Sequence, residues 1–139
     1  MGRYYSGDIE GKFWFTVQSS DDADFFGVEG EYVYPEGEDG EPDESMEPME
    51  LSYYFTPEDM EAVEDGIGTC IEELGDNLYK LDDFFGKVDG YNDNDIAVLL
   101  NVDKSEVKSI LEWYARLQLG KKIRWSLQAN EQCNFTCEL

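Results

Sequence analysis

The stretch of residues 56–85, TPEDMEAVEDGIGTCIEELGDNLYKLDDFF, decides the fold, because it predicts a long amphipathic helix whose apolar face must be covered. A hydroxyl N-cap at Thr56, a proline at the first helical position and two acids after it are the usual signals for a helix start. We expect this helix to run to about residue 85, or to divide into two helices at residues 75–77. Its apolar side chains recur every three or four residues: Met60, Val63, Ile67, Ile71, Leu74, Leu78, Leu81 and Phe85.

Shorter segments on both sides of this helix predict β-strands. Residues 9–17 alternate between apolar and polar side chains, which is the period of two expected of a strand with one buried side. Residues 31–34 and 51–55 are rich in aromatic side chains and predict two more strands. Residues 123–127 and 133–139 alternate in the same way and predict a C-terminal β-hairpin.

Together these elements predict an α+β fold class. N-terminal β-strands and a C-terminal β-hairpin pack against the long amphipathic helix and against a helix-turn-helix-like pair at about residues 93–120. A length of 139 residues with 41% hydrophobic side chains suffices for one core, so we expect a single domain over residues 1–139. Residues 36–50 hold eight carboxylates and two prolines without apolar periodicity, and we expect an acidic, flexible loop there.

Net charge is the strongest functional signal of this chain. It holds 33 Asp and Glu against 10 Lys and Arg and has no His, which gives a formal net charge of −23. A globule of this length is about 37 Å wide, and duplex DNA of that length carries about 22 charges. Because like charges destabilise a compact state, an excess of negative charge of this size predicts that the electrostatic field of the protein has a function. Adaptation to high salt is the competing explanation.

The acidic side chains of the predicted helix gather opposite its apolar face. Ordinary solvated faces interleave both signs, because opposite charges three or four residues apart stabilise a helix. Here Lys80 is the only base in residues 56–85. An ordinary solvated face is the alternative, but we expect this carboxylate ridge to bind a partner. At 100° per residue its members fall within a sector of about 60°: Glu58, Glu61, Asp65, Glu72, Asp76 and Asp83.

The leading hypothesis is therefore a non-enzymatic acidic interaction protein that mimics DNA. It would block or modulate a nucleic-acid-binding partner through the basic surface of that partner, and would not bind nucleic acid itself. A phage-encoded inhibitor of host defence is the biological setting that this charge favours by analogy, which would make the chain a viral protein. Trp14, Tyr34 and Tyr54 are candidates for exposed interface anchors, with packing in the core as the alternative.

A second pattern, DNDIAVLLNVDKSEVKSILE at residues 93–112, resembles the helix-turn-helix motif. The resemblance implies two helices that cross closely, with Asn101 in the left-handed conformation that the turn requires. The apolar positions that carry the resemblance are Ile96, Ala97 and Leu100 in the first helix and Val102, Val107 and Ile110 after the turn.

The alternative function is a transcription regulator with a winged helix-turn-helix at residues 93–138, in which residues 121–138 form the wing. Residues 104–124 hold six of the ten bases against two acids, whereas residues 1–103 carry a net charge of −25 (four bases less 29 acids). That field opposes the approach of DNA beyond a Debye length of about 8 Å. The candidate DNA-contacting residues are Lys104, Ser105, Lys108, Ser109 and Arg116.

Other classes of function have little support. The absence of His removes the commonest general base and metal ligand, and no phosphate-binding or dinucleotide-binding fingerprint is present, so we predict no enzyme activity, cofactor or metal site. No apolar run approaches the roughly 20 residues that span a bilayer. Three cysteines without a signal peptide predict a cytoplasmic protein, in the host cell if it is viral. Repulsion between copies favours a monomer.

Overall fold

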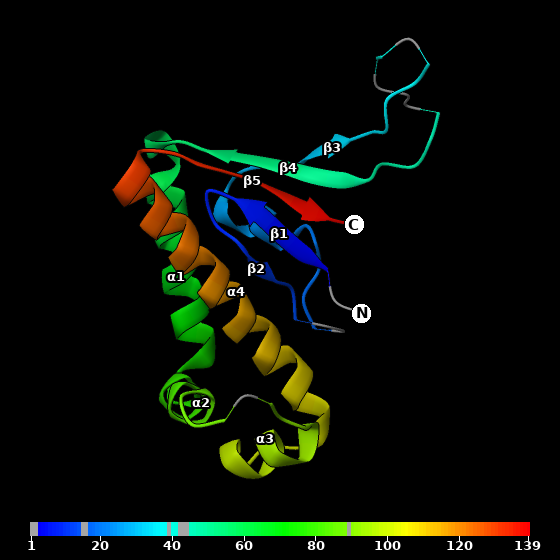
Figure 1. Cartoon of the computed structure of the whole chain (residues 1–139). Helices are drawn as coiled ribbons and strands as arrows, with labels where there is room; N and C mark the ends of the chain where they lie inside the picture. Colours follow the sequence, from blue (N-terminus) through cyan, green and yellow to red (C-terminus); the bar gives the residue numbers. More distant parts are fainter. Residues whose placement is uncertain (1–2, 15–16, 39, 42–44, 89) are drawn as a thin grey trace.

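The computed structural model describes residues 3–14, 17–38, 40–41, 45–88 and 90–139 (Figure 1). Four α-helices, five β-strands and two 3₁₀ turns make up this described part of the chain. In chain order they are β1 (Tyr4–Gly7), β2 (Gly11–Lys12), η1 (Asp22–Phe26), β3 (Glu31–Val33), β4 (Glu50–Phe55), η2 (Pro57–Asp59), α1 (Met60–Leu74), α2 (Asn77–Phe85), α3 (Asp93–Leu100), α4 (Lys104–Asn130) and β5 (Cys133–Glu138).

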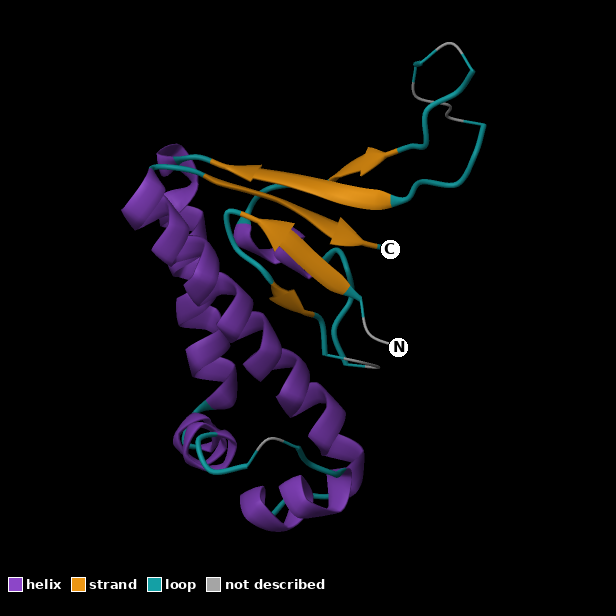
Figure 2. Ribbon diagram, in the orientation of Figure 1, coloured by secondary structure: helices purple, strands orange, loops and turns teal. Residues whose placement is uncertain are grey.

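The strands form one antiparallel sheet in the order β2-β1-β5-β4-β3, and the predicted α+β fold class is confirmed. One face of the sheet is buried, and on it Tyr53, Phe55 and Phe135 stack with ring centroids 5.4 to 6.3 Å apart. None of the described helices covers the opposite face (Figure 2). An antiparallel sheet of this kind alternates buried and exposed side chains, as β5 does along Cys133–Glu138.

Helices α1 and α4 lie side by side and run in opposite directions, while α2 and α3 close the end of this pair that lies farther from the sheet (Figure 1). The ring of Phe26, from η1, fits between the two long helices. A Cβ atom at Gly66 would lie 2.7 Å from that ring, and one at Gly120 would lie 2.5 Å from it. Glycine at these two positions therefore lets α1 and α4 close around Phe26.

The predicted C-terminal hairpin is wrong, because residues 123–127 continue α4 rather than form a strand. The predicted end of the helix-turn-helix-like pair at about residue 120 is wrong for the same reason, because α4 passes through Gly120 and continues to Asn130. The apolar side chains that α4 buries here are Leu119, Ile123 and Leu127, four residues apart, which is the spacing of a helix face. Trp125, which completed the apparent alternation, points away from the core and is 59% exposed. Strand β5 pairs with β1 and β4 instead.

The long helix divides at Gly75, the second of the two expected outcomes. Gly75 adopts φ 54° and ψ −136°, a conformation that glycine reaches without a Cβ clash. Helix α2 then starts in a new direction: Figure 1 shows α2 nearly end-on while α1 is seen from the side. The start of the helix is confirmed, because Thr56 and Asp59 form a capping box.

The N-terminal strands also differ from the expectation. The predicted strand at 9–17 is limited to β2, and the amides of Val17 and Gln18 donate to the Trp14 carbonyl in a turn. Residues 15–16 lie outside the described part of the chain. Strands β3 and β4 confirm the predictions at 31–34 and 51–55, and the acidic segment between them projects beyond the sheet (Figure 1). Residues 39 and 42–44 of this predicted flexible loop are also outside the described residues.

Candidate interaction surface

The outer face of α1 carries five carboxylates and no base. The buried positions Val63, Ile67, Cys70 and Leu74 turn the other side of the helix toward α4 and the sheet. All five carboxylates are exposed, and none forms an ion pair within 4.0 Å among the described residues. Their charge is therefore not neutralised within that part of the chain. They are Glu61, Glu64, Asp65, Glu72 and Glu73.

The structure divides the predicted carboxylate ridge into two parts. Glu61, Asp65 and Glu72 lie on α1, and Glu58 precedes it in η2. Asp76 and Asp83 belong to the α2 segment, which runs in another direction, so the ridge does not continue as one line. Asp83 also pairs with Lys87, with Nζ and Oδ2 3.0 Å apart. The ridge is therefore interrupted at Gly75, as the alternative of two helices implies.

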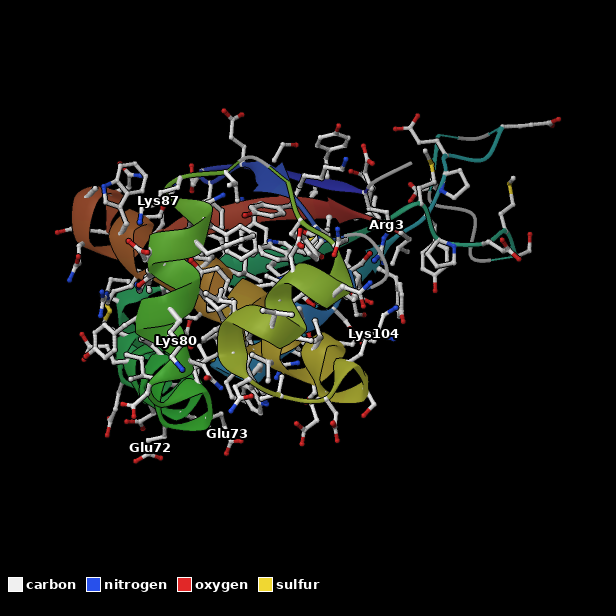
Figure 3. All side chains as sticks on the ribbon, turned by 90° about the horizontal axis from the view of Figure 1, so that it is seen from below. Arg3, Glu72, Glu73, Lys80, Lys87 and Lys104 are labelled. Atoms are coloured by element: carbon white, nitrogen blue, oxygen red, sulfur yellow. The ribbon has the colours of Figure 1, made fainter. Side chains whose placement is uncertain are left out.

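Sequence reasoning missed Glu64 and Glu73, which lie outside the 60° sector of the ridge but remain on the solvent side of α1. The absence of any base in α1 could have indicated that Glu64 and Glu73 belong to the same acidic surface. Figure 3 shows Glu72 and Glu73 projecting away from the molecule, with Lys80 on α2 and Lys104 at the start of α4. The base nearest in sequence to these carboxylates therefore belongs to a different helix.

Gly68 lies in the middle of this acidic face. It is exposed, and a Cβ atom there would have no neighbour within 4 Å. Glycine inside a helix costs about 1 kcal/mol relative to alanine. Phe26 accounts for Gly66 and Gly120, but no contact within the described part of the chain accounts for Gly68.

The helix-turn-helix-like pair is present at α3 and α4. The Asn92 side chain caps α3 by accepting from the Asp95 amide at 2.9 Å, and Asn101 adopts the predicted left-handed conformation with φ 55°. Ile96, Leu100 and Val107 are buried, as the motif requires. The pair is continuous with the rest of the fold, because α4 is 27 residues long and packs against α1 as well as α3.

The candidate DNA-contacting residues do not form one surface. Lys104, Ser105, Lys108 and Ser109 are exposed in the first turns of α4, close in sequence to the exposed acids Asp103 and Glu106. The first turn of α3 adds two more exposed acids, Asp93 and Asp95. Arg116 lies elsewhere, with only 15% of its side chain exposed.

Arg116 is held inside the protein. Its Nε donates to Asp22 Oδ1 at 2.7 Å, its Nη2 donates to Glu112 Oε1 at 3.1 Å, and its guanidinium lies 4.6 Å from the Trp113 ring. Burial raises the pKa of the Asp22 carboxyl, and the hydrogen bonds from Gln18 and Arg116 oppose this shift. Arg116 thus joins η1 to α4 and is not available to a ligand.

The predicted wing at residues 121–138 is wrong. Residues 121–130 belong to α4, and β5 is the central strand of the sheet. Lys122 donates to the Tyr5 hydroxyl at 2.8 Å and to the Glu10 carbonyl at 3.0 Å, so it ties α4 to the β1–β2 turn. Lys122 therefore contributes to the fold.

Of the three candidate aromatic anchors, one lies on an open face. Tyr54 is 53% exposed on the uncovered side of the sheet. Trp14 packs against Phe85, Tyr91 and Tyr114, with ring centroids 5.3 to 5.9 Å away, so the packing alternative holds for it. Tyr34 is half-buried.

A shallow hollow of about 490 Å³ lies between the β1–β2 turn and α4. Asp8, Glu10 and Lys122 contribute charges of both signs to its lining, beside the exposed Trp125. The ammonium of Lys122 already has two acceptors there. This hollow does not share the uniform charge of the α1 face.

No protein-family model matches the chain, and neither a similar curated protein nor a similar solved structure was found. Across the described ranges, no helix combines the length and apolar character that crossing a membrane requires.

Proposed function

We propose that the protein is a non-enzymatic acidic interaction protein that mimics DNA, and that it blocks or modulates a nucleic-acid-binding partner through the outer face of α1. The observation that carries the proposal is the set of five exposed carboxylates on α1 without an ion pair among the described residues. Their complement is a basic surface on another molecule, and opposed potentials accelerate association at low salt.

The arrangement of charge supports a protein partner over direct DNA binding. The exposed bases at the start of α4 have four exposed acids near them in sequence, and Arg116 is occupied by Asp22. The net charge of −23 on the protein opposes the approach of DNA phosphates at long range. A phage-encoded inhibitor of host defence is the setting that this proposal favours.

The test is a competition experiment on proteins captured from host lysate. Partners of the proposed kind are nucleic-acid-binding proteins that elute at about 0.5 M salt and are displaced by double-stranded DNA. The triple variant Glu61→Lys, Asp65→Lys, Glu72→Lys is expected to fold and to lose this capture. If the folded triple variant still captures these nucleic-acid-binding proteins, the proposal is wrong.

A matched control changes as much charge elsewhere. Glu29, Glu38 and Glu47 are exposed loop carboxylates, and their change to Lys alters the net charge by the same amount as the α1 triple variant. The control is expected to retain most of the capture. Equal loss in both triple variants would mean that net charge alone, and not the α1 face, attracts the partner.

The transcription regulator remains the alternative, and the left-handed turn at Asn101 is the observation that favours it. It requires DNA binding by the parent protein at low salt and loss of binding on Lys104→Glu and Lys108→Glu. An absence of DNA binding at low salt excludes this alternative and leaves the acidic interaction protein.

A further inference from the structure

Strand β3 forms one edge of the sheet, and large apolar side chains beside it are exposed. It stands last in the order β2-β1-β5-β4-β3, so its outer side has no neighbouring strand among the described residues. Tyr32 in β3 is 57% exposed, and Met49, which directly precedes β4, is also 57% exposed. The end of the sheet that holds these two side chains projects beyond α1 and α4 (Figure 1).

These apolar side chains lie on the side of the sheet that forms the core. Tyr32 is opposite the buried Leu51, and residues opposite each other on neighbouring strands share a face. Tyr34, two residues on, lies beside Tyr32, with ring centroids 6.5 Å apart. The Met49 carbonyl accepts from the Leu139 amide at 3.4 Å, which continues the β4–β5 pairing, and alternation gives Met49 the face of Leu51. We call Tyr32, Tyr34 and Met49 the apolar ledge.

The other side of β3 is acidic. Glu31 is exposed opposite Ser52, and Val33 lies opposite Glu50, all on the uncovered side of the sheet. Neither carboxylate has an ion pair within 4.0 Å among the described residues. Residues 29–50 hold ten acids and no Lys or Arg. A strand that paired with β3 would therefore meet apolar side chains on one face and carboxylates on the other.

We propose that β3 binds an extended segment of a partner protein, which adds a strand to the sheet and alternates apolar with basic side chains. Its apolar side chains contact the apolar ledge, and its basic side chains face Glu31 and Glu50. In this mode of recognition, main-chain hydrogen bonds give affinity and the alternate side chains give specificity. Exposed tyrosine and methionine side chains are typical of interfaces. The inference goes beyond the proposed function, because it requires neither the α1 face nor a nucleic-acid-binding partner.

Charge decides between the possible occupants of this edge. A second copy would bring the same ten acids against residues 29–50, and like charges opposite each other destabilise a strand pair. Nucleic acid meets the same repulsion. Charged side chains on an edge strand are a common means of preventing pairing with identical chains. The carboxylates beside β3 oppose such pairing and attract a basic segment.

The test uses a fluorescein-labelled peptide in which valine and arginine alternate. The control peptide has the same composition, with all valines before all arginines, so that its charge is equal but its side chains do not alternate. Fluorescence anisotropy at physiological salt measures both affinities. We expect the alternating peptide to bind at least about tenfold more tightly; equal affinity of the two peptides would overturn the proposal.

Hydrogen exchange followed by mass spectrometry locates the bound peptide. Strand addition gives the backbone of β3 new hydrogen-bond partners, so exchange in the segment 31–34 is expected to slow when the alternating peptide binds. Slower exchange confined to α1 would place the peptide on the acidic helix face and overturn the proposal.

Variants separate the apolar ledge from the charge. Tyr32→Ser is expected to raise the Kd for the alternating peptide about tenfold, whereas Tyr79→Ser, at a position 75% exposed on α2, should bind as wild type does. Glu31→Lys should weaken binding more than Glu73→Lys, which makes the same charge change on α1. Circular dichroism checks that each variant folds. Equal effects within either matched pair would contradict a site on β3.

Failure of this inference differs from failure of the proposed function. Retained peptide binding in the α1 triple variant, together with reduced binding in Tyr32→Ser, would support a separate site on β3 whether or not the α1 face binds its own partner. The reverse pattern would overturn the inference. Analytical ultracentrifugation of the free protein adds one more check, because a dimer that Tyr32→Ser dissociates would assign this edge to a second copy and would also overturn it.

Discussion

Arg116 shows how a charge read as a ligand-binding group can instead belong to the core. Its partner Asp22 is 4% exposed at the side chain and also receives a bond of 2.8 Å from Gln18 Nε2. The guanidinium is further enclosed by the rings of Phe25 and Trp113, at 4.9 and 4.6 Å. A buried carboxylate with all these partners connects η1 to α4 and is costly to leave without its cation.

We expect Arg116→Met to lower the free energy of unfolding by about 3 kcal/mol, because it keeps the apolar stem and leaves Asp22 buried without a cation. Urea denaturation followed by circular dichroism measures the change. Lys80→Met, at an exposed position of α2, is the control and should change stability by less than about 0.5 kcal/mol. A loss in Arg116→Met no larger than that of the control would show that the ion pair does not stabilise the fold.

Helix propensity predicts that Gly120→Ala stabilises the protein, whereas the contact between Gly120 and Phe26 predicts that this substitution destabilises it. Alanine favours a helix by about 1 kcal/mol over glycine, but a Cβ atom there would lie 2.5 Å from the Phe26 ring. We expect Gly120→Ala to lose about 1 to 3 kcal/mol of stability through overpacking. The loss of stability on Gly120→Ala should be smaller in a protein that also carries Phe26→Leu. An unchanged loss in that protein would show that Phe26 is not the cause of the overpacking.

Among the elements, the turn between α3 and α4 depends on one backbone conformation. Asn101 has φ 55°, where a Cβ atom is disfavoured and asparagine is tolerated better than most residues. Asn101→Ala is expected to cost about 1 kcal/mol, whereas Asn101→Gly should leave stability within about 0.5 kcal/mol of wild type. Thermal denaturation of the two variants checks this order, and a reversed order would contradict the role of the turn.

The helices and strands also show how far sequence reasoning reaches. Elements with a strong local signal were predicted correctly: the helix start at Thr56, the α3 start and the turn at Asn101 all depend on neighbouring residues. Errors arose where a distant residue decides the structure. Gly120 looked like a helix end, because only the position of Phe26, far away in the sequence, explains a glycine inside α4.

The candidate site was predicted in part for the same reason. Helical periodicity identified Glu61, Asp65 and Glu72 as one exposed face, and the structure confirms that they lie on α1. The glycine at residue 75 indicated a possible division of the helix, but periodicity could not give the direction of α2, which carries Asp83 away from the line of α1. Arg116 counted as a free base in the sequence, because Asp22 is 94 residues away along the chain.

Across the whole molecule, self-repulsion at a net charge of −23 should make stability depend on salt. Raising sodium chloride from low to moderate concentration shortens the Debye length and is expected to raise the melting temperature of the wild type by several degrees. Neutralising Glu61, Asp65 and Glu72 with amide side chains should reduce this salt dependence. A melting temperature independent of salt would show that the charges are too well hydrated to oppose folding.

Alkaline pH should unfold the protein through its buried thiols. Burial raises the pKa of Cys70 and Cys133 to about 11 and that of Cys137 to about 12, from an ordinary value of 9.0. The unfolded chain therefore releases these protons at a lower pH than the folded chain does. Stability should be intact below about pH 9 and should fall between about pH 9 and pH 12.

Denaturation midpoints measured across this pH range check the expectation. Cys133→Ala and Cys137→Ala together are expected to flatten the alkaline decline while lowering stability at neutral pH, because they remove buried atoms from β5. An equally steep decline in this double variant would assign the effect to the buried tyrosines, since burial also raises the pKa of Tyr53 and Tyr114.

The position of β5 in the sheet has a consequence for how the chain folds. Strands β1 and β4 do not touch each other; both pair with β5, which follows them by more than 70 residues. The α1–α4 helix pair can therefore assemble while the two halves of the sheet are still separate, and closure of the sheet waits for the most distant contacts in the chain. Helical signal should develop before tyrosine burial in a stopped-flow experiment, and removal of β5 should leave a helical chain without a sheet.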